Sequence, residues 1–303
     1  MLTTRSAPAL IALLALATPA LAQTKVVLVG VDQATQRELG PFGGSYRAHH
    51  ATLIERLNRA RAKGIAFDVY FPPNPEQVEG TRRLADAAAR SVAGGVPVVI
   101  AVGAPPESKG KEPKLIPNDP IFRGKGIGEG AIVLVRERSG VMSRGGLATL
   151  RTVGGYRPLA EELALRTGVL AEGELERLGL VEEVPTAASL FGGTVTQAAL
   201  RPGFSDTPPG SVTTVSYADV LNGRVGRDVL EGALVLVGLN DGKQDMIRDP
   251  DPSGSPTLKS LPGVFAHVAL LQRAVRAAEA KPQAQVSAKR PTTRGLLGAL
   301  GTR

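Results

Sequence analysis

The chain has 303 residues, of which 43% are apolar and 21% charged, the balance of a folded protein rather than of a disordered one. It contains no Cys, which excludes disulfide frameworks and cysteine-ligated zinc or iron–sulfur sites. Trp is absent and aromatic residues make up only 4%, so the stacking platforms typical of nucleic-acid-binding proteins are lacking.

The first 22 residues have the pattern of an export signal. Arg5 provides a positive start, Ala9 to Leu16 form an apolar run, and Ala20 to Ala22 form a small-x-small cleavage site before Gln23. The apolar run is shorter than the roughly 20 residues that a membrane-spanning helix needs, and no Cys follows it for a lipid anchor. We therefore expect residues 1–22 to be removed and the mature protein to be periplasmic or secreted. The alternative is a buried N-terminal helix.

The body of the chain alternates predicted strands and helices. Five apolar runs predict buried strands: Val26 to Val31, Ile65 to Tyr70, Val96 to Val102, Ala131 to Val135 and Ala233 to Leu239. Amphipathic patterns predict helices over Ala51 to Ala62, Arg82 to Ala93, Leu159 to Arg166, Tyr217 to Leu221 and Val264 to Ala278. Continuous apolar strands are typical of sheets covered on both faces. The pattern predicts a three-layer, doubly wound α/β fold with a mostly parallel central sheet and helices on both faces.

Two of the predicted strands share one pattern. Val27 to Asp32 (VLVGVD) recurs as Val235 to Asn240 (VLVGLN), each with a Gly near the end and an Asp or Asn just beyond. Similar packing of two central strands would explain the repeat, and so would a duplicated ligand motif. In either case Asp32 and Asn240 leave neighbouring strand ends, where open α/β sheets bind ligands.

Charge is concentrated at the end of the chain. The formal net charge is +8, but residues 281–303 hold five basic residues and no acid, and Arg5 would leave with the signal. The remaining body carries only +2, which argues against a nucleic-acid partner because such binding needs clustered Lys and Arg. No composition break divides the body. We expect one domain over residues 23–280 and a disordered basic tail over residues 281–303, while residues 170–211 give no clear pattern.

The common catalytic motifs are missing from the sequence. It has no Gly-x-Ser-x-Gly elbow, no His-Glu-x-x-His helix, no calcium-loop pattern and no Cys nucleophile. Gly124 to Gly130 (GKGIGEG) is glycine-rich, but its spacing is not that of a phosphate-binding loop, and a strand follows it instead of a helix. The sequence therefore predicts no catalytic residue, no cofactor and no metal.

Several polar residues could nevertheless gather at the strand ends: Asp32, Asp68, Asn240, Asp245, Asp249 and Asp251. Carboxylates that converge at one sheet edge could bind a hard cation such as calcium or magnesium. The alternative is that each Asp caps a helix, closes a turn or is solvated. Asp68 differs because it lies inside an apolar strand, where a buried acid needs a partner such as Arg47 or a loop amide.

Two of the three His lie in predicted helices. His50 is expected to open the first helix and to make an N-terminal side-chain contact rather than bind a metal. His267 lies among apolar residues of the last helix and is expected to be half-buried and hydrogen-bonded. A catalytic His needs an orienting partner and a substrate pocket, and the sequence identifies neither.

Taken in chain order, these segments resemble the CHASE2 family of extracytoplasmic sensor domains. The matching segments are VVLVGVD (26–32), RAHHA followed by LIERL (47–57), GIAFDVYF (64–71), VSYADVL (215–221), LEGALVLVG (230–238), Asp245 with Pro250, and PGVFAH (262–267). Two segments depart from the family pattern. Gly43 to Tyr46 stands where members usually have Trp and Pro, and Glu137 to Arg144 keeps the Gly of an Asp-x-Asp-Gly turn without its two Asp.

The resemblance implies a sensory or ligand-binding domain that is not an enzyme. Members usually precede membrane helices and a cytoplasmic cyclase, kinase or phosphodiesterase, whereas this chain ends in a polar tail. We expect a stand-alone exported domain that acts through an unknown small ligand or envelope protein. The candidate ligand-binding residues are Asp32, Arg47, His50, Asp68, Asn240 and Asp245. Two other functions stay open: a solute-binding protein of a transporter, normally two-lobed, and a metal-dependent hydrolase that uses the strand-end aspartates.

Overall fold

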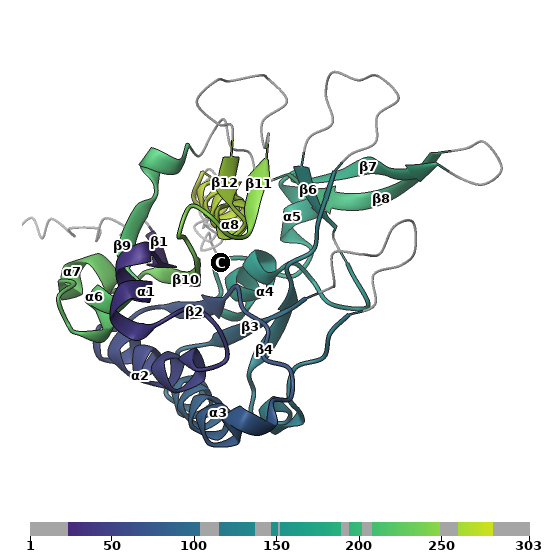
Figure 1. Cartoon of the computed structure of the whole chain (residues 1–303). Helices are drawn as coiled ribbons and strands as arrows, with labels where there is room; N and C mark the ends of the chain where they lie inside the picture. The colour runs from purple at the N-terminus through teal and green to yellow at the C-terminus, as the bar shows by residue number, and fades with distance from the viewer. Residues whose placement is uncertain are drawn as a thin grey trace, which may run out of the picture.

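The centre of the protein is a six-stranded, all-parallel sheet (Figure 1). The computed structural model describes residues 24–103, 115–136, 147–150, 152–188, 194–201, 208–248 and 260–280. The strands are β1 (Val26–Val31), β2 (Gly64–Phe67), β3 (Val98–Val102), β4 (Gly128–Ala131), β9 (Thr213–Ser216) and β10 (Leu234–Leu239). Their order is β4-β3-β2-β10-β1-β9, and each neighbouring pair is parallel. The predicted α/β fold is confirmed.

Helices cover both faces of this sheet (Figure 1). One face carries α2 (Tyr46–Arg59), α3 (Val78–Ala93) and α6 (Tyr217–Leu221), whose apolar side chains pack on Val27 and Val29 of β1. The opposite face carries α4 (Leu159–Arg166) and α8 (Val264–Glu279). Because successive strand residues point to opposite faces, each buried strand contributes to both cores.

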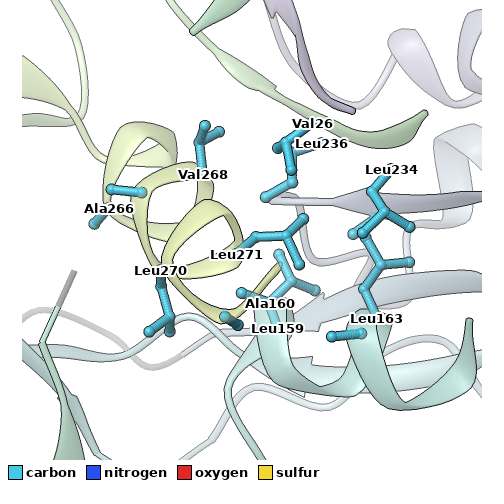
Figure 2. Packing of buried hydrophobic residues seen from close by; sticks show 14 of the residues in the cluster. Val26, Leu159, Ala160, Leu163, Leu234, Leu236, Ala266, Val268, Leu270 and Leu271 are labelled. Atoms are coloured by element: carbon cyan, nitrogen blue, oxygen red, sulfur yellow. The ribbon is translucent and has the colours of Figure 1, made fainter. Parts of the chain in front are cut away.

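The core beneath α4 and α8 is aliphatic. Figure 2 shows Leu163 of α4 and Leu271 of α8 gathered over Leu234 and Leu236 of β10. All four side chains are fully buried. This packing anchors α8 along its length to the strands, so the position of its first turn is set by the sheet beneath it.

Shorter elements surround the core. The remaining described helices are α1 (Gln33–Leu39), α5 (Glu174–Arg177) and α7 (Arg227–Leu230). A second sheet, which the sequence did not predict, is antiparallel with the order β5-β6-β8-β7, and it contains β5 (Leu134–Arg136), β6 (Leu147–Leu150), β7 (Val181–Ala188) and β8 (Thr194–Leu200). A third, two-stranded sheet pairs β11 (Met246–Arg248) with β12 (Ser260–Pro262) in antiparallel fashion. Among these ranges, no helix combines the length and the apolar character needed to cross a bilayer.

One strand prediction is wrong. The single strand expected over Ala131 to Val135 is divided, because β4 ends at Ala131 and β5 begins at Leu134 in a different sheet. Close packing of a helix explains the glycines in the segment before it. A Cβ on Gly130 would lie 2.6 Å from the Cα of Leu159, so α4 can approach β4 this closely only over glycine.

The repeated Gly of β1 and β10 also serves packing. Gly30 and Gly238 are directly paired in the register of the two strands. A Cβ on Gly30 would lie 2.8 Å from the Cβ of Asn240, and one on Gly238 would lie 2.6 Å from Cγ2 of Val264. Both glycines therefore admit a side chain onto the sheet, which supports the packing explanation of the repeat.

Gly238→Ala is expected to lower the free energy of unfolding by about 1–3 kcal/mol, because the added methyl group collides with the first residue of α8. Urea unfolding measures the change. Gly43→Ala is the matched control, since a Cβ there would meet no atom within 4 Å. Equal stability of the two variants would show that α8 does not sit closely on β10.

Candidate functional site

Three of the predicted site residues follow three adjacent strands. Asp68 comes directly after β2, Asn240 after β10 and Asp32 after β1, and these strands are neighbours in the sheet. The carboxyl ends of parallel strands meet at one edge, which is where open α/β sheets bind ligands. The structure therefore brings these three residues to one edge of the sheet.

Asp32 has a local structural role at this edge. Its Oδ1 accepts a hydrogen bond of 2.7 Å from the backbone N–H of Thr35, which caps the N-terminus of α1. The hydroxyl of Ser216 donates to the same oxygen over 3.2 Å. Asp32 thus joins α1 to the end of β9, in agreement with the helix-capping alternative.

Asn240 continues the ladder of β10. Its backbone N–H donates to the carbonyl oxygen of Val31 over 3.0 Å, and its half-buried side chain lies over Gly30. The amide group therefore lies at the end of the β1–β10 pair, on the sheet edge that also carries Asp32.

Asp68 points toward α8, on the face opposite Phe67. Its side chain is only 7% exposed, and its Oδ1 lies 3.9 Å from Nε2 of His267. Burial raises the pKa of Asp68 to about 7, because the charged carboxylate is poorly solvated there. The described residues place no Lys or Arg within ion-pair distance of Asp68.

His267 lies in the first turn of α8 and is 1% exposed. Its Nδ1 has no hydrogen-bond partner among the described residues. Burial lowers the pKa of His267 to about 4, so the ring is neutral at pH 7. The expectation of a half-buried, satisfied histidine is wrong on both counts. The signal that could have found it was its helical spacing, three residues after Val264 and four before Leu271, which are both fully buried.

Asp245 lies close to Asp68 and His267, near the start of α8. Its backbone has a positive φ of 49°, and its carbonyl oxygen accepts a 2.7 Å hydrogen bond from the N–H of Gly263. The residue is solvent-exposed, but its carboxylate packs against Gly263, which is buried. Partial burial, followed by the nearby charge of Asp68, raises the pKa of Asp245 to about 6.

We call Asp68, Asp245 and His267 the acid–histidine cluster. Asp68 and His267 form its buried pair, and Asp245 is an exposed residue close enough for its charge to interact with both. Within the described ranges, no group of three His, Cys, Asp or Glu side chains is arranged to hold a metal ion. Asp249 and Asp251, two members of the predicted cation site, lie outside the described residues.

Arg47 belongs to the other face of the sheet. Its guanidinium donates to Oγ1 of Thr81 over 2.5 Å and to the carbonyl oxygen of Pro72 over 2.6 Å, and it lies 5.9 Å from the centre of the Phe71 ring. Burial lowers its pKa. Arg47 therefore ties α2 to α3 and to the loop after β2, whereas Asp68 faces His267 instead of this arginine.

His50 is also part of the core beneath α2. It lies in the second turn of that helix, which begins at Tyr46, so the expectation that it opens the helix is wrong. Its Nδ1 is 2.9 Å from the hydroxyl of Tyr217, and its ring packs edge-on against Phe67 and Phe71. Burial lowers its pKa to about 3. His50 thus lies on the opposite face of the sheet from the acid–histidine cluster.

A hollow of about 660 Å³ lies elsewhere, beside the edge strand β4. It contains none of the predicted site residues, and its charges are largely paired. Nε of Arg166 donates to Glu162 over 2.6 Å, and the amide of Asn118 donates to Glu129 over 2.8 Å. We favour the acid–histidine cluster as the site, because it holds buried ionisable groups that lack such partners among the described residues.

Comparison with known proteins identifies one family. The family model of the CHASE2 domain matches residues 5–301, nearly the whole chain. No curated protein and no solved structure matches the chain.

Proposed function

The chain belongs to the CHASE2 family of sensory domains, and on this premise we propose that it is an exported sensor whose responsive site is the acid–histidine cluster at the start of α8. The observation that carries this proposal is a buried Asp68–His267 pair without a cationic partner among the described residues. Unpaired buried carboxylates reduce stability, and strongly shifted pKa values gather at functional sites.

The organisation of the chain follows from its sequence. We place the export signal at residues 1–22, the sensor domain at 23–280 and the basic tail at 281–303. The leader pattern supports the export step, and the family is one of extracytoplasmic sensors. The mature protein is accordingly periplasmic or secreted.

The output of the sensor is assigned to a partner. The domain changes the surface around Asn240, Asp245 and the first turn of α8 when its stimulus acts, and an envelope protein reads that surface. No reaction is assigned to the chain, because the cluster pairs its histidine with a buried acid rather than with a nucleophile. A solute-binding function is disfavoured by the single central sheet, since such proteins usually have two lobes.

A thermal-shift screen of the mature chain tests the site. Amino acids, sugars, nucleotides, divalent cations and buffers from pH 4 to 9 are the probes. At least one condition is expected to move the melting temperature of the wild type by more than about 2 °C, the shift produced by about 1 kcal/mol of selective binding. Asp245→Asn and Asn240→Ala should reduce that shift.

Asp228→Asn is the control, because Asp228 is exposed on α7. Asn is the matched replacement for Asp245, since Asn tolerates a positive φ. If every effective condition acts equally on all variants, the cluster is not the responsive site. If any probe is turned over chemically, the assignment of a purely sensory role fails.

A further inference from the structure

The first turn of α8 is buried, and packing rather than a side-chain cap holds its start in place. Gly263 stands at its N-cap without a side-chain hydrogen bond, and Val264 rests on the bare backbone of Gly238. The segment before α8 is held by the pairing of three-residue strands in β11 and β12. The position of this turn therefore depends on the groups packed beneath it.

The buried pair beneath this turn can hold one proton. Oδ1 of Asp68 and Nε2 of His267 are 3.9 Å apart, and their side chains are 7% and 2% exposed. With its proton the pair carries no net charge. Without it, a carboxylate remains in an apolar setting and needs water, which a movement of the covering turn would admit. The exposed Asp245 is close enough for its charge to interact with both residues of the pair.

Among the described residues, the other charged groups near α8 do not compensate for the charge that Asp68 gains when the pair loses its proton. α8 packs against β1, β10, α4 and β12, and the three strands carry no ionisable side chain. On α4, Glu161 and Glu162 face Arg157 across 3.9 Å. In the loop before Asp245, the carboxylate of Asp241 accepts from the amides of Lys243, Gln244 and Gln36. The next charge on α8 is Arg273, which donates to the carbonyl oxygen of Arg201.

We propose that the first turn of α8 is a pH-operated contact, closed while Asp68 and His267 hold their proton and opened when rising pH removes it. This inference rests on the proposed sensory function and names its stimulus, the proton. Asp245 acts as the exposed group through which the pair exchanges protons with solvent. The partner then reads the open or closed position of residues 260–268.

Hydrogen–deuterium exchange on the mature chain tests the contact. Protection factors, which correct for the intrinsic pH dependence of exchange, are measured for the amides of α8 between pH 5.5 and 8.5. In the wild type, the first turn is expected to lose protection about tenfold per pH unit up to about pH 7 and to level off above it, while residues 270–278 stay protected. Asp68→Asn, which cannot ionise, should show no such loss, and Asp228→Asn should behave like the wild type.

A second measurement needs no variant. The chain has three His, so the ring signals of His267 can be resolved by NMR. They are expected to shift as Asp68 ionises near neutral pH, while those of buried His50 stay constant from pH 5 to 8. Constant protection in the wild type, or silent His267 signals, would overturn the pH-operated contact. The proposed sensory site would still be supported in that case if a compound in the thermal-shift screen acted through Asp245.

Discussion

Asp68→Asn is expected to match the wild type in stability near pH 4 and to exceed it above pH 8, by up to about 4 kcal/mol. The pKa of Asp68 is raised from 3.8 to about 7 in the folded protein. The folded state therefore holds this proton more tightly than the unfolded state. The resulting stability is fully present below pH 3.8 and is lost as the pH rises to about 7. The Asn side chain is neutral at every pH, so the variant does not lose this stability as the pH rises.

The difference between variant and wild type is the quantity to measure. His267 and His50 have pKa values lowered to about 4 and about 3, so their stability is present above pH 6.5 and is lost as the pH falls. In the acid range, the two His lower the stability of the wild type as the pH falls, which opposes the effect of Asp68. Because the variant keeps both His, their contribution largely cancels in the difference between variant and wild type. Urea unfolding at pH 4.5, 6.5 and 8.5 gives the three differences. Parallel profiles for Asp68→Asn and the wild type would show that Asp68 is not buried as described.

Much of the central sheet could be predicted from the sequence, because its strands are long apolar runs. β1 and the helices α4 and α6 have the bounds expected from periodicity. β4 was missed because Gly128 and Gly130 replace apolar residues where α4 approaches the strand. Such a strand has no hydrophobic signal, since the neighbouring helix supplies the burial.

The second sheet was harder to recognise for another reason. β7 contains Pro185 and two Glu, and its pairing with β8 shifts register just after that proline. Proline is confined to edge strands and bulges, and antiparallel strands with one polar face lack a continuous apolar run. Residues 170–211 therefore gave no clear pattern, although two of the four strands, β7 and β8, lie among them.

Which of the predicted residues share the candidate site depends on the face of the sheet on which each lies, and hydrophobic periodicity alone did not show this. Asp32, Asp68 and Asn240 were predictable as strand-end residues, and the structure places them at one edge. β2 ends at Phe67 instead of Tyr70, but alternation still puts Asp68 on the face opposite Phe67, and only the structure shows that α8 covers that face. Asp68 therefore faces α8 and His267, while Arg47 and His50 lie beyond the sheet in the other core.

His50→Ala is expected to lower the free energy of unfolding by about 3–5 kcal/mol at pH 7, the cost of deleting a large buried ring. The ring fills space between Phe67, Phe71 and Tyr217, and its loss also leaves the Tyr217 hydroxyl without its hydrogen-bond partner at Nδ1. Tyr217→Phe, which removes only that hydrogen bond, should cost about 1–3 kcal/mol. The two losses of stability should not add in the double variant, because both substitutions remove the same hydrogen bond between Tyr217 and His50.

His49→Ala is the matched control for this comparison. His49 occupies the preceding position on α2, is half-buried and touches only the edge of the Tyr46 ring among the described aromatic contacts. Its replacement should change stability by less than about 1 kcal/mol. If His50 instead bound a ligand, His50→Ala would leave unfolding close to that of His49→Ala and would abolish a thermal shift in the screen. A large loss of stability assigns His50 to the core, and it leaves recognition to the acid–histidine cluster on the other face of the sheet.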